Sequence, residues 1–423
     1  MDQISRQLLY LLSVSMETDM DTVVDIVEAD WDRLFYLSGI HNIIPMIYRS
    51  ISKKQLVPLI EPKLILVWKK LATWYSVDQF LKTSEFLTIY AKLKQAGVNA
   101  LVIKGIVLRT LYPNCDERCS GDEDIYIRRE DYSRTASILT SSGFTLSNYS
   151  KQGAAPRQEN VYVNAKSDLI LEVHIDLFDP EIGIFKAMND HFVSVFERSI
   201  EISIEGIPIR TLSYSDHLLF QILHCAKHFI GIGFGIRQVC DLVLFCNTHG
   251  KEIDYLWVWQ QVTQLGYDTF LLNLFAIGRE YLGLLAQAVW YPPSAIMADI
   301  HPDALLEDIM RAGAFGKSNK DRARTSSMTL QAVIADRNNR HKGYDKKQLL
   351  RISFPEQEIM GDKYSYCRNK PYLLPIAWLH RMATYAALVK NPVQMLYQVS
   401  RSFTIGRKRI ELLKEYKIIG QHN

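Results

Sequence analysis

The chain has 423 residues, of which 48% are hydrophobic and 22% charged, and its formal net charge is +3. These values are typical of a globular protein long enough to bury a substantial core, and they exclude a low-complexity chain. A net charge this small argues against nucleic acid as the main partner.

The six cysteines include no C-x-x-C pair, which is typical of reduced thiols in a cytoplasmic protein rather than of disulfides or a zinc site. The first twelve residues carry Asp2 and Arg6 and lack the layout of a signal peptide. No stretch reaches the roughly 18 uncharged apolar residues that span a bilayer. We therefore expect a cytoplasmic protein without a transmembrane segment.

Residues 1–95 are expected to form an N-terminal helical region, because apolar residues recur at a spacing near 3.6 in segments 40–51 and 65–93. Residues 96–212 change in character and are expected to form the catalytic core. Short strands are predicted at 99–103, 124–128, 159–164 and 169–178, with a further strand pair around Glu205-Gly206. Helices are predicted between them, at 106–112 and 130–142.

Residues 213–423 are expected to form a C-terminal helical region. Its first helix is predicted to be capped by Ser215 or Asp216. Residues 311–350 are rich in Gly, Ser, Asn, Lys and Arg and are interpreted as a long loop, and helix returns from 372 onward. The whole order predicts an α+β fold, in which a small mixed β-sheet is flanked by N- and C-terminal helical regions.

The most informative segment is the strand that contains Asp122 and Asp124. Side chains alternate along a strand, so both aspartates are expected on one face, where they repel each other unless a cation neutralises them. The segment 169–178 supplies a third acid, since Glu172, His174 and Asp176 share one face of that strand. We therefore expect Asp122, Asp124 and Glu172 to act as metal ligands and catalytic groups for Mg²⁺ or Mn²⁺.

A strand that ends at Lys104-Gly105 and opens a helix precedes this acidic strand. Backbone N–H groups at a helix start, together with the Lys104 ammonium, are suited to phosphate. This order of strand, glycine, helix and acidic strands is the one needed for metal-dependent nucleotidyl transfer, in which metal ions clamp a triphosphate and stabilise the leaving pyrophosphate.

The chain resembles a bacterial family of poorly characterised nucleotidyltransferases within the DNA-polymerase-beta-like superfamily. The residues that carry the resemblance are Ile103-Lys-Gly105, Leu111-Tyr-Pro113, Arg118 with Asp122 and Asp124, Gly143-Phe144, Leu171-Glu-Val-His174, His224-Cys-Ala-Lys-His228, Asp241-Leu242, Gly313-Ala-Phe-Gly316 and Leu373 to Arg381, with Asp30-Trp31-Asp32 and His41 near the start. The resemblance implies Asp122 and Asp124 as metal ligands and Glu172 as the third carboxylate.

The sequence departs from the superfamily pattern at two positions. Ile106 stands where a serine usually follows Gly105, so Lys104 and backbone amides are expected to contact phosphate instead. Glu123 stands between the aspartates, where an apolar residue is usual, and is expected to point at the core face.

Several side chains near the predicted site have two interpretations. Arg118 is expected to contact phosphate or to pair with a local carboxylate, and His174 to contact the substrate or to hydrogen-bond beside Glu172. His224 and His228 are expected to hydrogen-bond carboxylates such as Asp241, or to face the nucleotide, rather than to bind metal.

The functional hypothesis is a nucleotidyltransferase that uses an NTP or a nucleotide-activated donor. Its acceptor would be a hydroxyl or phosphate on a peptide, a saccharide or a small molecule, as in a biosynthetic tailoring enzyme. Two alternatives stay open at this point: a nucleotide-binding module without turnover, and a repurposed transferase that moves a sugar or phosphate group.

Overall fold

The structure is a computed structural model that describes residues 1–18, 24–147, 157–296, 300–314, 320–337, 357, 360, 362–367, 370–388 and 392–420. Its main helices are α1 (Gln3–Met16), α2 (Trp31–Ile40), α3 (Ile44–Lys53), α4 (Pro62–Gln95), α5 (Ile106–Arg109), α6 (Tyr132–Ser141), α7 (Gly183–Asn189), α9 (Tyr214–Ile230), α10 (Ile236–His249), α11 (Tyr255–Gln264), α12 (Asp268–Tyr281), α14 (Pro302–Ala312), α15 (Lys320–Arg337), α17 (Leu374–Leu388) and α18 (Pro392–Glu415).

Seven strands form one mixed sheet in the order β3-β4-β5-β2-β1-β7-β6. They are β1 (Leu101–Val102), β2 (Glu123–Tyr126), β3 (Phe144–Leu146), β4 (Glu159–Asn164), β5 (Ile170–His174), β6 (Ile200–Ile204) and β7 (Ile207–Thr211). β2 runs parallel to β5 and antiparallel to β1, and β6 and β7 form the hairpin predicted around Glu205-Gly206. The predicted α+β fold, a small mixed sheet with helical regions before and after it, is confirmed.

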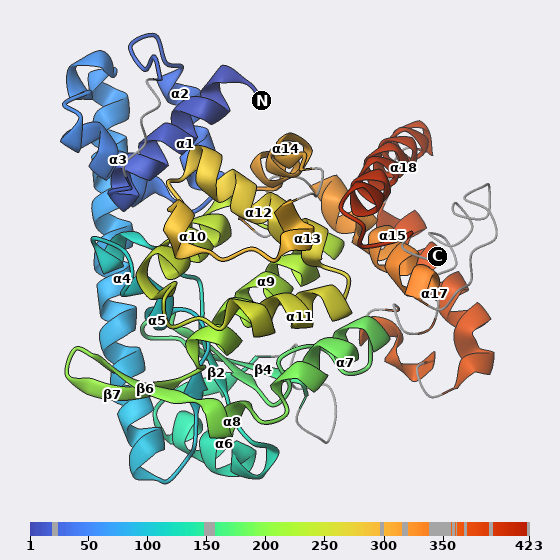
Figure 1. Cartoon of the computed structure of the whole chain (residues 1–423). Helices are drawn as coiled ribbons and strands as arrows, with labels where there is room; N and C mark the ends of the chain where they lie inside the picture. The colour runs from blue at the N-terminus through green and yellow to red at the C-terminus, as the bar shows by residue number, and fades with distance from the viewer. Residues whose placement is uncertain are drawn as a thin grey trace.

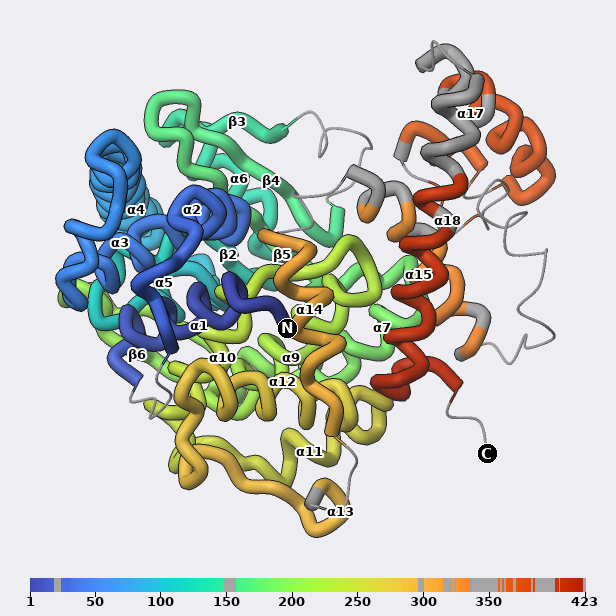
Figure 2. Tube along the Cα trace, turned by 90° about the horizontal axis from the view of Figure 1, so that it is seen from above, coloured from blue at the N-terminus to red at the C-terminus, as the bar shows by residue number. Residues whose placement is uncertain are grey.

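The long helix α4 runs along one flank of the molecule beside the sheet, and α15 and α18 form the opposite flank (Figures 1 and 2). One face of the sheet packs on the second half of α4 and on α6, where Phe86, Tyr90 and Leu139 meet Ile125 and Val173. A second, larger core joins the N-terminal helices to α9, α10 and α12. The polar ends of β2 and β5 are therefore placed near the packed helices α9 and α10.

Two predictions for the C-terminal helical region are wrong. The helix predicted to be capped by Ser215 or Asp216 begins earlier, because the Ser213 hydroxyl caps it by accepting the N–H of Asp216 at 3.2 Å. Asp216 is instead buried in an ion pair with Arg198.

The segment interpreted as a loop at 311–350 contains the 18-residue helix α15. The sequence of α15 is too polar to show an amphipathic pattern, and the helix gains its stability from tertiary contacts, as most protein helices do. It packs on α18, and its buried Arg322 forms an ion pair with Asp308 of α14 at 2.7 Å. Residues 315–319, which hold Phe315 and Gly316 of the family-like motif, and 338–350 lie outside the described residues.

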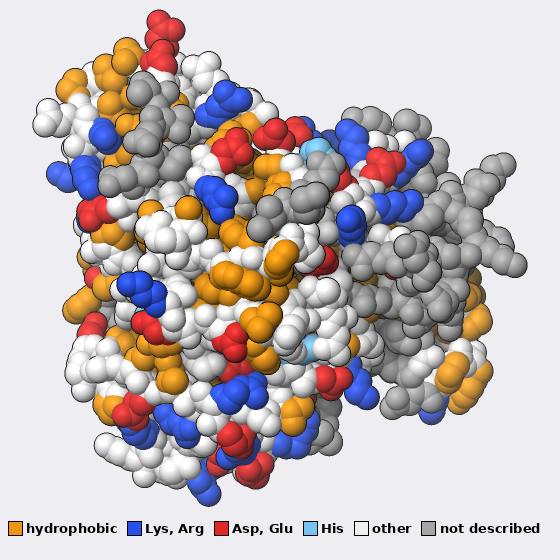
Figure 3. Space-filling model, in the orientation of Figure 1, with side chains coloured by type: hydrophobic (Ala, Val, Ile, Leu, Met, Phe, Trp, Pro, Cys, Tyr) orange, Lys and Arg blue, Asp and Glu red, His pale blue; other side chains and the backbone are white. Residues whose placement is uncertain are grey.

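The outer surface shows no single dominant charge on the face drawn in Figure 3. Lys and Arg side chains lie interspersed with Asp and Glu over most of the described part of that face. None of the described helices is both long and apolar enough to cross a membrane.

Candidate functional site

The acidic groups of the predicted site come from two neighbouring strands. Asp124 of β2 is paired in register with Glu172 of the parallel strand β5, so both side chains leave the same face of the sheet. His174 follows on that face, with its Nε2 3.1 Å from Asp124 Oδ1 and 3.7 Å from Glu172 Oε2. One ligand atom from each of Asp124, Glu172 and His174 lies within 4.8 Å of the others, which is close enough for all three to hold one cation.

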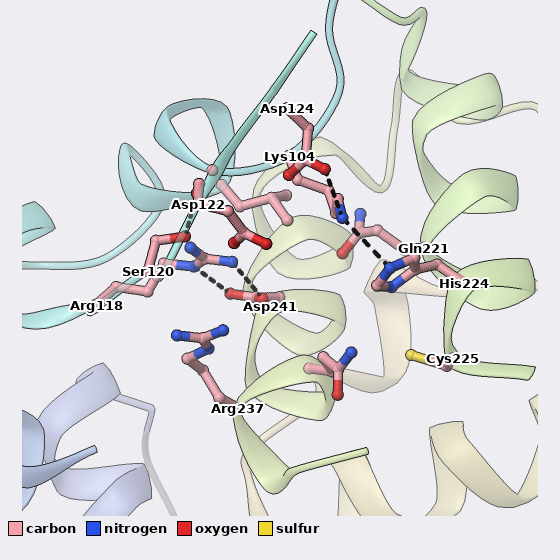
Figure 4. Close-up of a pocket in the computed structure, with 13 residues that line it drawn as sticks. Lys104, Arg118, Ser120, Asp122, Asp124, Gln221, His224, Cys225, Arg237 and Asp241 are labelled. Atoms are coloured by element: carbon pink, nitrogen blue, oxygen red, sulfur yellow. Dashed lines mark hydrogen bonds and ion pairs between the residues drawn. The ribbon is translucent and has the colours of Figure 1, made fainter. Parts of the chain in front are cut away.

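Asp122 lies just before β2 and is half-buried. It lines the same pocket as Asp124, but the cluster of three ligand atoms does not include it. Its backbone carbonyl accepts a hydrogen bond from the Ser120 hydroxyl at 2.8 Å (Figure 4). Burial, followed by the charge of Asp124, raises the pKa of the Asp122 carboxyl. The structure thus brings Asp124 and Glu172 together as predicted, adds His174, and places Asp122 beside them.

Lys104 neutralises the most buried of these acids. Its Nζ lies 3.0 Å from Asp124 Oδ1, and Asp124 is 1% exposed. Burial alone would raise the pKa of Asp124, but the Lys104 ammonium and the hydrogen bond from His174 hold it below its usual value. Burial likewise opposes the charge on Lys104, yet Asp124, Asp122 and Glu172 together raise the pKa of its ammonium. Lys104 therefore carries its positive charge into the pocket.

Glu172 and His174 lie side by side, and the pKa values of both groups are raised. Burial raises the pKa of Glu172 to about 7, against the opposing effect of the nearby His174 ring. Burial opposes protonation of His174, but its hydrogen bond to Asp124 and the nearby Glu172 carboxylate raise its pKa to about 9. The structure shows His174 hydrogen-bonded to Asp124 beside Glu172, and its contact with a substrate stays a prediction.

Glu123 explains why glycine is needed at position 105. Glu123 is 1% exposed and points away from the acidic cluster, where its Oε1 lies 2.6 Å from Nη2 of the equally buried Arg109. Its Oε2 accepts the N–H of Ile106 at 2.9 Å. Gly105 has φ +50°, and a Cβ there would lie 2.0 Å from Glu123 Oε2. Glu123 thus points at the core face as expected, and it already engages the first amide of α5.

Arg118 pairs with a carboxylate that is distant in sequence. Its Nε and Nη2 each donate to the carboxylate of Asp241 at 2.7 Å, and the Tyr112 hydroxyl donates to the same group at 2.7 Å. Burial opposes the charge on Asp241, but Arg118 holds the pKa of that carboxyl below its usual range. The carboxylate-pairing interpretation of Arg118 is the one observed.

The histidine pair on α9 does not hydrogen-bond Asp241, whereas His224 lines the pocket, as the second expectation for this pair requires. His224 Nε2 lies 3.3 Å from Lys104 Nζ and 3.1 Å from His228 Nε2, and Asp241 is engaged by Arg118 and Tyr112 instead. Burial, and then the charge of Lys104, lowers the pKa of His224 well below its usual value. A neutral His224 accepts a hydrogen bond from Lys104, which helps to fix the position of that ammonium.

Asp122 and Asp124 line a pocket between the sheet and the helices α9 and α10 (Figure 4). Its lining residues come from four segments of the chain: Lys104, Gly105, Leu108, Arg118, Ser120, Asp122, Asp124, Gln221, His224, Cys225, Arg237, Gln238 and Asp241. Arg237 was not anticipated from the sequence, because it follows a glycine-rich turn that carries no catalytic signature and lies far from the acidic strand. Only the packing of α10 against α9 brings it to the pocket.

A comparison with protein-family models identifies the family of this chain. No curated protein has a sequence that matches this chain. The model of one family, described as uncharacterised nucleotidyltransferase, matches residues 27–283, which is more than half of the chain and includes the sheet, α9, α10 and every lining residue of the pocket. The chain therefore belongs to this nucleotidyltransferase family.

Proposed function

We propose that the protein is a metal-dependent nucleotidyltransferase of the DNA-polymerase-beta-like superfamily, which transfers a nucleotidyl group from an NTP to an acceptor hydroxyl or phosphate. The observation that carries this proposal is the pairing of Asp124 with Glu172 on adjacent parallel strands, within 4.8 Å of His174 and beside Asp122 and Lys104.

The donor atoms of this cluster suit a divalent cation. Carboxylate oxygens from Asp122, Asp124 and Glu172 are the ligands that Mg²⁺ and Mn²⁺ prefer. The imidazole of His174 either orients Asp124 or replaces one of these oxygens. When bound, the ion would supply positive charge that stabilises the phosphates and lowers the pKa of an acceptor hydroxyl.

The reaction transfers the nucleotidyl group by substitution at the α-phosphorus. The acceptor oxygen forms a bond to that phosphorus, the bond to the bridging oxygen breaks, and pyrophosphate leaves. Asp124 or Glu172 takes the acceptor proton. Lys104, next to Gly105, brings a positive charge to the phosphates. Arg118 also lines the pocket, where its pairing with Asp241 fixes its position.

The test measures pyrophosphate release from each of the four NTPs with Mg²⁺ or Mn²⁺ and a panel of peptide, saccharide and small-molecule acceptors. Asp122→Asn, Asp124→Asn and Glu172→Gln should each lower the rate at least about 100-fold, because each removes a carboxylate that would hold the metal ion. Binding of Mn²⁺, measured by electron paramagnetic resonance, should weaken in the same variants.

Asp176→Asn is the matched control. Asp176 lies just beyond β5 on the same chain segment, pairs with Arg129 at 3.6 Å and stands outside the acidic cluster. It should leave metal binding and turnover unchanged. If Asp124→Asn binds Mn²⁺ and turns over as the parent does, the metal site is assigned to the wrong residues.

One observation favours the second candidate, a nucleotide-binding module without turnover. Glu123 already engages the N–H of Ile106, at the helix start that would otherwise face phosphate. In that case the parent protein would bind an NTP with metal and release no pyrophosphate with any acceptor. Transfer of a sugar or phosphate group would instead show as product formed without pyrophosphate.

A further inference from the structure

The pocket contains buried polar groups that the carboxylate cluster does not use. Arg237 is 7% exposed and Gln221 is 6% exposed, and both line the pocket. Nη1 of Arg237, both amide atoms of Gln221 and Nη1 of Arg118 have no hydrogen-bond partner among the described residues. Leaving a buried donor or acceptor unpaired costs about 1–3 kcal/mol, and more for a charged group, so this arrangement is unfavourable for folding alone.

The charges of the pocket single out Arg237. Lys104 pairs with Asp124 and Arg118 pairs with Asp241, whereas the described carboxylates include no ion-pair partner within 4.0 Å of Arg237. Burial, and then repulsion by Arg118, lowers the pKa of Arg237. A buried guanidinium without an ion-pair partner among the described residues is stabilised by an anion that enters the pocket.

The positions of these groups match an extended anion. In Figure 4, Asp124 and Lys104 lie at one end of the pocket, the Arg118–Asp241 pair lies in the middle, and Arg237 lies beyond it. Gln221 enters from the side of Lys104 and His224. The pocket is partly open to solvent, and the centres of water-sized groups have about 40 Å³ within it. A single water needs roughly 10–15 Å³, so the pocket has room for small polar groups such as phosphate oxygens.

The helix start after Gly105 offers little to a phosphate, since Glu123 takes the N–H of Ile106 and no serine hydroxyl is present. Another part of the pocket must therefore supply the donors for the phosphate tail. Arginine is suited to this role because its planar guanidinium presents several N–H groups to phosphate oxygens.

We propose that Arg237, together with Gln221 and Nη1 of Arg118, forms an anion subsite that binds the β- and γ-phosphates of the donor nucleotide. This inference rests on the proposed function, because it assigns the phosphate tail of that reaction to helices α9 and α10.

The experiment measures binding of inorganic tripolyphosphate, with Mg²⁺, by isothermal titration calorimetry, alongside thermal unfolding of the same samples. Arg237→Met should weaken tripolyphosphate about 10- to 100-fold, the loss expected for a hydrogen-bonded charge, and Gln221→Met by a smaller factor. Both variants should unfold at the same temperature as the parent or higher, because each removes an unpaired buried polar group. Arg237→Lys should recover part of the affinity.

Arg128→Met is the matched control, since Arg128 is partly exposed and pairs with Glu197 away from the pocket. It should leave tripolyphosphate affinity unchanged. A purely structural role for Arg237 predicts the reverse pattern, in which Arg237→Met and Arg237→Lys lower the unfolding temperature and leave tripolyphosphate affinity intact. That result would overturn the subsite.

Further measurements separate the sources of the anion and the two proposals. If Arg237→Met weakens orthophosphate but leaves tripolyphosphate and NTP affinity unchanged, the donor assignment is overturned in favour of an acceptor phosphate. If pyrophosphate is released and Arg237→Met does not raise KM for the NTP, the subsite falls while the enzyme function stands. If tripolyphosphate binding depends on Arg237 and no turnover occurs, the subsite stands and the enzyme function falls.

Discussion

The buried ion pair between Glu123 and Arg109 should be the most sensitive point of the sheet. Both side chains are 1% exposed, and Glu123 also accepts the N–H of Ile106. Glu123→Gln keeps an acceptor for that amide but leaves the Arg109 guanidinium buried without a counter-charge. Breaking a buried pair in this way costs about 3–5 kcal/mol of unfolding free energy, which lowers the folding equilibrium constant by a factor of roughly 10²–10⁴.

The double variant Arg109→Met, Glu123→Gln tests the cause. It removes the orphaned charge and keeps the acceptor, so it should recover to within about 2 kcal/mol of the parent, since apolar replacements of buried pairs are well tolerated. Urea unfolding measures all three proteins, and hydrogen–deuterium exchange reports on the 101–112 segment, where the Ile106 amide should exchange faster in Glu123→Gln alone.

Glu201→Gln provides the same chemical change on the surface. Glu201 is half-exposed and pairs with Lys94 at 2.9 Å, so its loss should cost no more than about 1 kcal/mol. A Glu123→Gln protein as stable as Glu201→Gln, or a double variant that is no more stable than Glu123→Gln alone, would refute the reasoning.

Two further predictions concern stability away from the pocket. His41 is fully buried between the carbonyl of Met310 and the N–H of Ile236, and burial lowers its pKa to about 4. Above pH 6.5 the ring is neutral in both the folded and the unfolded state. As the pH falls from 6.5 towards 4, only the unfolded chain gains the proton, which should lower the free energy of unfolding by up to about 3 kcal/mol. Urea unfolding as a function of pH should show a steeper loss in the parent than in His41→Gln, because other buried histidines such as His217 lose stability over the same range in both proteins; equal slopes for the two would contradict the prediction. Asp308→Asn leaves Arg322 buried without its partner and should cost about 3–5 kcal/mol; an unchanged urea midpoint would show that other contacts hold Arg322.

The acidic strands could be predicted from the sequence because their signal is local. Alternation along a strand places Asp122 with Asp124, and Glu172 with His174, without knowledge of the rest of the chain. The expected order of elements places the third acid on a neighbouring strand, and this predicts that β2 pairs with β5. What alternation could not show is that His174, rather than Asp122, completes the cluster of ligand atoms with Asp124 and Glu172.

The rest of the pocket could not be predicted because its partners are distant in sequence. The carboxylate of Asp241 meets Arg118 across more than a hundred residues, and Arg237 reaches the pocket only through helix packing. Helix α15 escaped prediction for a related reason: its polar residues, such as Arg322, are buried against other helices instead of facing solvent. A pattern of hydrophobic residues in the sequence cannot indicate such buried polar contacts.

The family match ends at residue 283, yet helix α9 depends on residues beyond it. Arg409 of α18 donates to the carbonyls of Phe229 and Gly231 at the end of α9, and Tyr416 packs edge-on against the ring of Phe229. In a chain truncated to the matched segment, those carbonyls would lose their Arg409 donors and the aromatic ring of Phe229 would be exposed to solvent. The last turns of the helix that carries Gln221 and His224 would then fray. Any graft of this pocket into another protein therefore has to include the C-terminal segment with Arg409 and Tyr416.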